Sequence, residues 1–294
     1  MHVAFLFQKL LATIKPLPSE LLRARGHAAT IKARLSSSFK LRKFIVVGSH
    51  SRGSAIRSYS DLDCFAVVSR DDARWGGTYI SSYAVLERLR GELASRFPQT
   101  MVSRDQQAVV VRFEAGGYPV DVVPAFYWGT GPSNWPVYRI PNGAGFWMET
   151  GPEIHGKFIR EADERSRGKL RRAVQFLKFW RECRSPRIPL SSFHLELLLA
   201  DYGICEGAKP YSRCVTEAFQ LLAERECRAY RDPMKISGNV PAVKSEAQRE
   251  AALRSVIYSR DHARAAHYAE SDSDHAEAQR QWNIVFNGNF PRRV

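Results

Sequence analysis

The sequence lacks the features that mark a membrane or secreted protein. It has no run of eighteen apolar residues, so we expect no transmembrane helix. The opening sixteen residues have no basic leader, and Lys9 interrupts their apolar run, which is not typical of a signal peptide. Internal repeats and long low-complexity segments are also missing. These absences predict a cytoplasmic protein with no membrane partner.

Cysteine is scarce, and its spacing shows no pairing motif. The chain has five cysteines, an odd number with no C-x-x-C motif, which argues against a disulfide framework. Cys205, Cys214 and Cys227, with His194 near them in the sequence, offer zinc-binding atoms. Their spacing is not that of a zinc ribbon or finger, so we interpret them as buried, reduced thiols.

Charge is abundant and mostly of one sign. With 44 Lys and Arg against 30 Asp and Glu, the formal net charge is +14. This excess favours polyanionic partners such as nucleotides or nucleic acid. The 294 residues, 44% of them hydrophobic, are enough for one large domain or two closely packed ones.

Apolar periodicity predicts strands in the first half of the chain and helices in the second. The segment "LDCFAVV" is apolar on both faces beyond its acid, which is typical of a central strand. A passage rich in Gly, Pro and Asn, residues 128–152, separates the two halves. The predicted elements are two N-terminal helices, strands at 43–47 and 62–68, a helix at 82–97, a hairpin over 108–126 turning around Gly116-Gly117, and helices at 168–183 and 191–203, with mostly helical structure to about residue 267.

This order of elements predicts an α+β protein. Residues 1–150 form a mixed sheet flanked by helices, and residues 151–294 form a helical domain. We expect the functional site in a cleft between the two.

Three aspartates lie in or beside apolar strands, where carboxylates are costly. Asp61 and Asp63, two residues apart, project from the same face of one strand, and Asp121 lies in the second arm of the hairpin. Gly48-Ser49 directly follows the strand before them. Three carboxylates held on adjacent strands form an oxygen-rich site suited to Mg²⁺, and Gly48 and Ser49 suit a bound phosphate. As an alternative, Asp61 and Asp63 cap a turn or pair with Arg52 and Arg57.

The segments "GS", "RGSAIRSYSDLD", "VDVVPAF", and "FLKFW" followed by "SSFHLELL" occur in the order expected of one family. In them the chain resembles the DNA polymerase β-type nucleotidyltransferase superfamily, and within it the bacterial cGAS-like (cyclic GMP-AMP synthase-like) nucleotidyltransferases. The resemblance covers residues from about 44 to 203. It implies a polymerase β-type catalytic core followed by a helical nucleotide-binding domain.

The resemblance also implies a role for each matching residue. Asp61, Asp63 and Asp121 would be catalytic and bind two Mg²⁺ ions, which Mn²⁺ can replace. The nucleotide-binding residues would be Gly48 and Ser49 at the donor phosphates, Lys178 and Ser192 at the triphosphate, and Phe193 stacked on a base. The family usually has Tyr where this chain has Phe193, and Thr where it has Ser54. These two changes leave base selection open.

Each of the last three residues has a structural alternative. Lys178 can extend from the flank of a helix, Ser192 can be a helix cap, and Phe193 can be a core residue. His50, between Ser49 and Ser51, is a conceivable acid–base group, although two-metal phosphoryl transfer needs none.

The resemblance implies an enzyme that makes a cyclic di- or trinucleotide signal from nucleoside triphosphates, with release of pyrophosphate, in anti-phage defence. ATP, GTP or a pyrimidine triphosphate would be the substrate, a product-gated effector protein the partner, and an RNA or peptide an activator. One alternative is a nucleotidyltransferase that modifies an RNA end or another hydroxyl. A second is a nucleotide- or RNA-binding sensor with a vestigial site. Intact acids at 61, 63 and 121 favour an enzyme.

Overall fold

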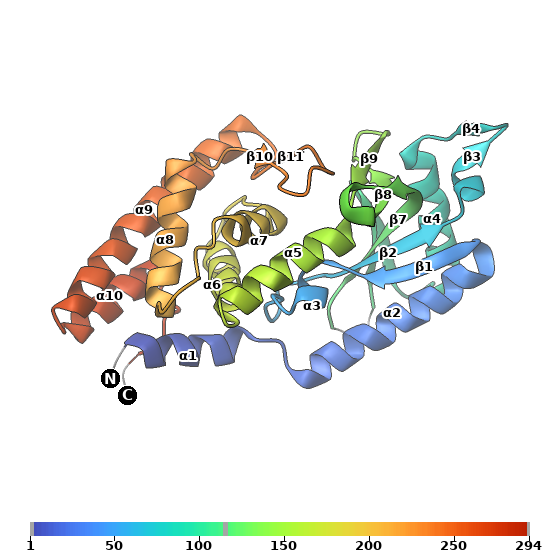
Figure 1. The fold of residues 1–294 in the computed structure, drawn as a ribbon. Coiled ribbons are helices and arrows are strands. Elements are labelled where there is room, and N and C mark those ends of the chain that lie inside the picture. Colours follow the sequence, from blue (N-terminus) through green and yellow to red (C-terminus); the bar gives the residue numbers. More distant parts are fainter. Residues whose placement is uncertain (1–2, 114–116, 293–294) are drawn as a thin grey trace.

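The centre of the N-terminal half is a seven-stranded mixed sheet (Figure 1). The computed structural model describes residues 3–113 and 117–292. The sheet has the order β1-β2-β7-β6-β5, and β8 and β9 extend it from β7. Its strands are β1 (Leu41–Val46), β2 (Leu62–Val68), β5 (Met101–Asp105), β6 (Ala108–Arg112), β7 (Val120–Thr130), β8 (Pro136–Pro141) and β9 (Trp147–Thr150). Two short pairs lie apart from it: β3 (Arg74–Trp75) with β4 (Thr78–Tyr79), and β10 (Tyr230–Arg231) with β11 (Asn239–Val240).

Helices follow the apolar periodicity of the sequence. Those around the sheet are α2 (Pro18–Ser38), α3 (Gly48–Arg52), α4 (Ser82–Arg96) and the 3-10 turns η1 (Arg70–Ala73) and η2 (Pro132–Asn134). Those of the other half are α1 (Val3–Ile14), α5 (Pro152–Arg165), α6 (Lys169–Glu182), α7 (Ser192–Asp201), α8 (Tyr211–Glu224), α9 (Glu246–Ser271) and α10 (His275–Val285). Figure 1 shows α5 crossing between the sheet and the helical half.

The two faces of the sheet have different surroundings. Helices α2 and α4 cover one face, where Ile31 and Leu89 join Cys64 and Ala66 of β2 in one apolar cluster. The alternate residue of β2, Phe65, belongs to a second cluster on the opposite face. Because side chains alternate along a strand, Asp61 and Asp63 share the face of Phe65. One face therefore supplies the core, and the other is left for a site.

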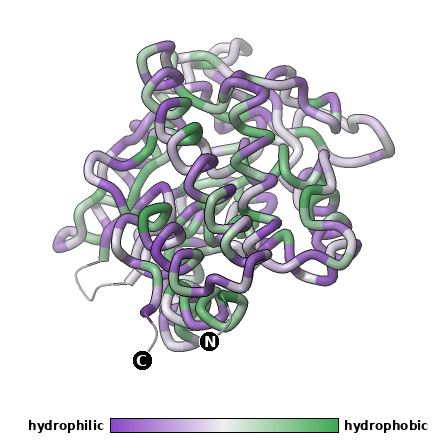
Figure 2. The backbone as a smooth tube through the Cα atoms, turned by 90° about the vertical axis from the view of Figure 1, so that its left-hand side faces the viewer, coloured by the Kyte–Doolittle hydropathy of each residue, from purple (hydrophilic) through white to green (hydrophobic). Residues whose placement is uncertain are grey.

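Helix α1 packs with the C-terminal helices, although it begins the chain. The ring of Phe7 contacts Phe176 of α6, Trp282 of α10 and Phe290 edge to face. The described ends of the chain accordingly lie side by side (Figures 1 and 2). The domain boundary predicted at residue 150 stays a prediction, but α1 shares its core with the helical half.

The predicted elements are confirmed, with one correction. Residues 128–152 are not only a connection, because they contain the end of β7 and all of β8 and β9. Antiparallel pairing of β6 with β7 confirms the hairpin, while Gly116 in its turn lies outside the described residues. Hydrophobic and hydrophilic stretches alternate along the chain (Figure 2). In the described part of the chain, no helix is both long and apolar enough to cross a membrane.

Candidate active site

A cleft of about 790 Å³ lies between the open face of the sheet and the helical half. One wall of the cleft includes Phe65, Val123 and Ile140 of the sheet. The opposite wall includes residues of α6, α7 and the loop before α7. This confirms the predicted cleft between the two halves. The expected site residues that line it are Gly48, Ser49, Asp61, Asp63, Lys178, Ser192 and Phe193.

The three aspartates are brought together by strand pairing. Strands β2 and β7 are parallel, and their register places Asp63 directly opposite Asp121. Neighbouring strands lie about 4.8 Å apart, so the two carboxyl groups start from adjacent positions. Asp61 precedes Asp63 on the same face of β2. Asp121 does not itself line the cleft, but it lies opposite Asp63, which does.

Burial and mutual repulsion raise the pKa values of these carboxyl groups. Burial, followed by the charges of Asp61 and Asp63, raises the pKa of Asp121 to about 7. Burial also raises the pKa of Asp63 to about 6, against the opposing effect of Arg52, and it raises the pKa of Asp61. Nearby cations lower these pKa values, Arg112 at Asp61 and Arg52 and Lys178 at Asp63, but burial outweighs them.

The alternative partners of these acids are excluded by the structure. Arg52 pairs with Glu196, and Arg57 pairs with Glu20. Among the described residues, no hydrogen bond or ion pair neutralises Asp61, Asp63 or Asp121, and Oδ1 of Asp121 is buried without a hydrogen-bond partner. Pairing with the two arginines was therefore the wrong alternative.

The donor set fits a hard divalent cation that arrives with phosphate. In the described part of the chain, no three His, Cys, Asp or Glu side chains are arranged to hold a metal ion by themselves. Mg²⁺ ordinarily takes only one or two protein carboxylates and completes its shell with substrate phosphates and water. The unpartnered Oδ1 of Asp121 and the facing Asp63 meet that requirement.

Gly48 is fixed by its contact with Asp63. Its φ of +65° is left-handed, and a Cβ at this position would lie 2.0 Å from Oδ2 of Asp63. Only glycine satisfies both conditions. The amide of Val47 donates to the carbonyl of Asp63 at 2.9 Å, which holds the Gly48-Ser49 loop beside the acids.

Lys178 lines the cleft but is already bound within the protein. Its side chain is 3% exposed, and its Nζ donates to Oε1 of Glu196 at 2.5 Å and to both the carbonyl and Oγ of Ser54 at 3.3 Å. It does not extend into solvent from the flank of α6. Its predicted role in binding triphosphate stays a prediction.

Ser192 and Phe193 lie at the start of α7. The cap of this helix is Ser191, whose Oγ accepts from the amide of His194, so the alternative that Ser192 is the cap was wrong. Phe193 is partly buried against the helical core and contacts His155 edge to face, with ring centroids 5.3 Å apart. Both residues still line the cleft, and their predicted contacts with nucleotide are untested.

The other candidate groups have structural surroundings. All five cysteines are free thiols, and Cys205, Cys214 and Cys227 are buried, as expected. Nδ1 of His194 donates to the carbonyl of Val240, so His194 does not join the three cysteines. Burial lowers the pKa of His50 to about 4, so at neutral pH it carries no charge.

Glu196 is a cleft residue that the sequence analysis missed. It lines the cleft, is 1% exposed, and binds three residues from two separate segments, the end of α3 and α6. A signal was present, because an acid inside the apolar run "FHLELLLA" is costly unless it is paired. The sequence could not have named the partners, which lie 18, 142 and 144 residues away.

Comparison with known proteins agrees with this geometry. A family model described as the Second Messenger Oligonucleotide or Dinucleotide Synthetase (SMODS) domain matches residues 1–163, more than half of the chain. The chain is 28% identical to the cyclic AMP-AMP-AMP synthase of Escherichia coli (strain MS 115-1) over 212 residues, 70% of this chain and 63% of that protein. It is 25% identical to a probable cyclic nucleotide synthase of Bacillus cereus (strain VD146) over 79% of this chain and 68% of that protein.

Solved structures share the fold over nearly the whole chain. The E. coli MS115-1 CdnC in complex with HORMA-deltaN superposes with a TM-score of 0.77 at 22% identity, covering 99% of both chains. The Bradyrhizobium diazoefficiens CD-NTase CdnG in complex with GTP gives 0.71 at 15% identity, covering 97% of this chain and 98% of that one. The resemblance inferred from the motifs is confirmed, and the chain belongs to the SMODS family of second messenger oligonucleotide or dinucleotide synthetases.

Proposed function

We propose that this protein is a Mg²⁺-dependent nucleotidyltransferase that joins nucleoside triphosphates into a cyclic di- or trinucleotide and releases pyrophosphate. One observation carries the proposal: Asp63 lies directly opposite Asp121 on adjacent parallel strands, with Asp61 two residues before Asp63 and with Gly48 and Ser49 in the same cleft. Membership in the SMODS family and the names of the two similar synthases support it.

Each bond would form by attack of a ribose hydroxyl on an α-phosphate. A P–O bond to the attacking oxygen forms, the bond to the β-phosphate oxygen breaks, and pyrophosphate leaves. Asp121, whose Oδ1 is buried and unpartnered, is placed to take the proton of the hydroxyl. The Gly48-Ser49 loop holds the donor phosphates through a backbone that glycine lets approach closely. Such transfer needs positioning and charge neutralisation more than covalent chemistry.

The metal would lie at the same carboxylates. Asp61, Asp63 and Asp121 would hold two Mg²⁺ ions, which would supply positive charge at the attacking and leaving oxygens. The fold holds the three carboxyl groups near one another, although this raises their pKa values and so disfavours their charged forms.

The helical half would bind the nucleotide. Ser192 and Lys178 lie at the triphosphate, and Phe193, half-buried at the start of α7, stacks on a base. ATP, GTP or a pyrimidine triphosphate would be substrates in the cytoplasm, where they are made. Regulation by a protein partner is supported by the similar E. coli CdnC, whose structure was determined with HORMA-deltaN. A product-gated effector and an anti-phage role complete the proposal.

The test is incubation of the purified protein with all four α-³²P-labelled ribonucleoside triphosphates and Mg²⁺ or Mn²⁺, followed by phosphatase. The expected result is a small phosphatase-resistant product that is absent with the Asp61→Ala variant. Leaving out one triphosphate at a time identifies the bases. In a second incubation with RNA added, a labelled RNA end in place of a small product would instead establish the alternative acceptor. Nucleotide binding without pyrophosphate release under any of these conditions would contradict the proposal.

A further inference from the structure

Glu196 is the most heavily hydrogen-bonded carboxylate at the cleft. Its Oε2 accepts from Nε of Arg52 at 2.5 Å, and its Oε1 accepts from Nζ of Lys178 at 2.5 Å and from Oγ of Ser54 at 2.9 Å. Burial opposes its charge, but Arg52 and Lys178 hold the pKa of Glu196 down at about 2. The carboxylate is therefore ionised and fully paired.

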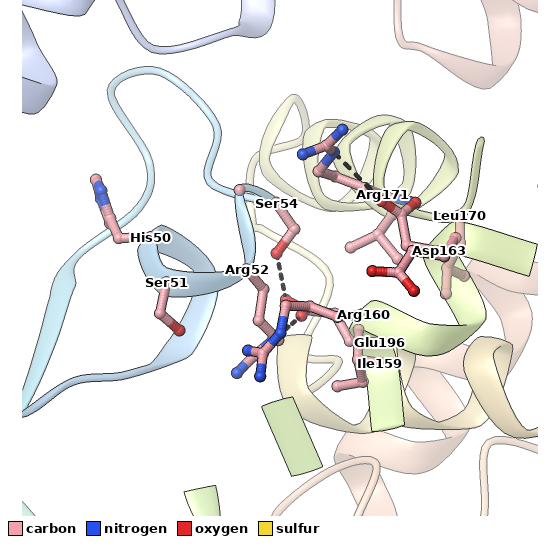
Figure 3. Close-up of a pocket in the computed structure, with 13 residues that line it drawn as sticks. His50, Ser51, Arg52, Ser54, Ile159, Arg160, Asp163, Leu170, Arg171 and Glu196 are labelled. Carbon is pink, nitrogen blue, oxygen red and sulfur yellow. Dashed lines mark hydrogen bonds and ion pairs between the residues drawn. The ribbon is translucent and has the colours of Figure 1, made fainter. Parts of the chain in front are cut away.

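These contacts join the two halves of the protein. Arg52 ends α3 and Ser54 follows it, whereas Lys178 and Glu196 come from α6 and α7. Figure 3 shows Arg52 and Ser54 approaching Glu196 from the α3 side. Gln175 of α6 adds a bond from its Nε2 to the carbonyl of Ala55 at 2.8 Å. The segment that carries the Gly48-Ser49 loop is thus bonded to the helical half.

Lys178 has no donor left for a ligand in this arrangement. An ammonium group has three protons, and Nζ has three acceptors: Oε1 of Glu196 and the two oxygens of Ser54. The geometry of Lys178 is consequently set by Glu196 and Ser54. Its electrostatic effect on a bound anion depends on the same pair.

The cluster carries one net positive charge beside the cleft. Arg52 and Lys178 contribute two charges, and Glu196 cancels one. Both cations are close enough to Asp63 to oppose the rise of its pKa. The remaining charge lies next to Gly48 and Ser49, the side of the cleft expected to hold phosphates.

We propose that Glu196 is a positioning residue for triphosphate binding: it holds Arg52 and Lys178 as a charged, ordered pair at the phosphate end of the cleft. This inference rests on the proposed function. Without Glu196, the two buried cations would lose the carboxylate that hydrogen-bonds to both of them, and a buried cation without such a partner is favoured to lose its proton. Lys178 is the group that would lose it, since arginine stays charged.

The protonation of Lys178 depends on the groups that face it. Burial lowers the pKa of Lys178, Glu196 raises it, and Arg52 and Arg181 lower it further. The facing groups are Glu196 from α7, Arg52 and His50 from α3, Asp63 from β2, and Arg181 on α6 itself. Removal of the Glu196 charge therefore moves the loss of the Lys178 proton to lower pH.

The experiment compares Glu196→Gln with the wild type by calorimetric titration of inorganic tripolyphosphate and of ATP with a methylene group in place of its α,β-bridging oxygen. We expect Glu196→Gln to weaken both by about tenfold at pH 8. The loss should be smaller at pH 6, where Lys178 keeps its proton. In turnover assays, KM should rise while kcat changes little.

Matched variants separate positioning from general stability. Glu270→Gln removes a carboxylate that binds Ser212 and Trp282 outside the cleft, and it should leave both affinities unchanged. If the Glu196→Gln variant does not fold, Ser54→Ala becomes the test variant. Ser54→Thr is its control, because threonine keeps the hydroxyl group. We expect the alanine variant to bind tripolyphosphate about threefold more weakly and the threonine variant to bind as the wild type.

The outcomes distinguish the inference from the proposed function. Folded Glu196→Gln that binds tripolyphosphate as tightly as the wild type at every pH overturns the inference alone. A fall in kcat with unchanged KM and affinity does the same. Wild-type protein that binds neither probe overturns both.

Discussion

The cleft contains two groups of carboxylates with opposite surroundings. Asp61, Asp63 and Asp121 form no ion pair with a described residue, and the pKa values of all three are raised. Glu196 is more deeply buried than any of them, yet its pKa is lowered to about 2, because two cations touch it. Partners, and not depth of burial, decide whether a buried carboxylate is ionised.

This difference separates the two roles. A carboxylate with partners is part of the scaffold, and its removal leaves charges exposed to an apolar interior. A buried carboxylate without partners destabilises the fold until a ligand pairs with its charge. The four predictions below follow from this contrast, in order of decreasing effect.

Replacement of Asp63 by Ala should give the largest loss. The side chain opposite Asp121 would be gone, and with it a ligand for the metal that neutralises the transferred phosphate. Several kcal/mol of transition-state stabilisation correspond to a loss of about a thousandfold in kcat. Pyrophosphate release measures it, with circular dichroism to show that the fold is intact. Turnover within tenfold of the wild type would remove Asp63 from the metal site.

Replacement of Glu196 by Gln should give the largest loss of stability. Breaking a buried ion pair costs about 3–5 kcal/mol, because it leaves an uncompensated charge. The pKa of Glu196 is lowered from 4.5 to about 2, so its contribution is complete above about pH 4.5 and is lost as the pH falls toward 2. Urea unfolding at pH 7 and pH 3 measures it. Equal destabilisation at both pH values would contradict the ionic explanation.

Replacement of Lys178 by Ala tests the cation side of the same cluster. Lys178 supplies one of the two positive charges at the phosphate end of the cleft, so its removal should weaken electrostatic attraction and raise KM for the nucleoside triphosphate by roughly tenfold. Lys209→Ala is the matched control, because that lysine pairs with Glu217 away from the cleft. An unchanged KM would assign Lys178 a structural role only.

Replacement of Asp121 by Asn should have the smallest effect on stability, and of the opposite sign. The raised pKa means that the charged form is destabilised in the fold, so this cost appears as the pH rises from about 4 through 7. With metal chelated at pH 8, the variant should melt about 2–4 °C higher than the wild type, and the gain should vanish at pH 4. A lower melting temperature at pH 8 would show that the carboxylate is stabilising.

Local sequence patterns were enough to predict the helices and strands and to place Asp61 and Asp63 on one strand face. The alternation in "LDCFAVV" predicted a central strand, and β2 lies between β1 and β7. The same two-residue period placed Asp61 and Asp63 on one face. The glycine-rich passage was harder to predict, because β8 pairs with β7 and β9 pairs with β8 through contacts that no local signal specifies.

The sequence by itself determined that a strand–loop–strand unit carries Gly48, Ser49, Asp61 and Asp63, because periodicity, turns and apolar runs are local properties. Tertiary structure alone decided the partners. The register between β2 and β7 places Asp121 opposite Asp63. The packing of α6 and α7 against the end of α3 brings Lys178 and Arg52 into hydrogen-bonding contact with Glu196. These pairings join residues from 18 to 144 positions apart, and their energy depends on burial that only the assembled fold creates.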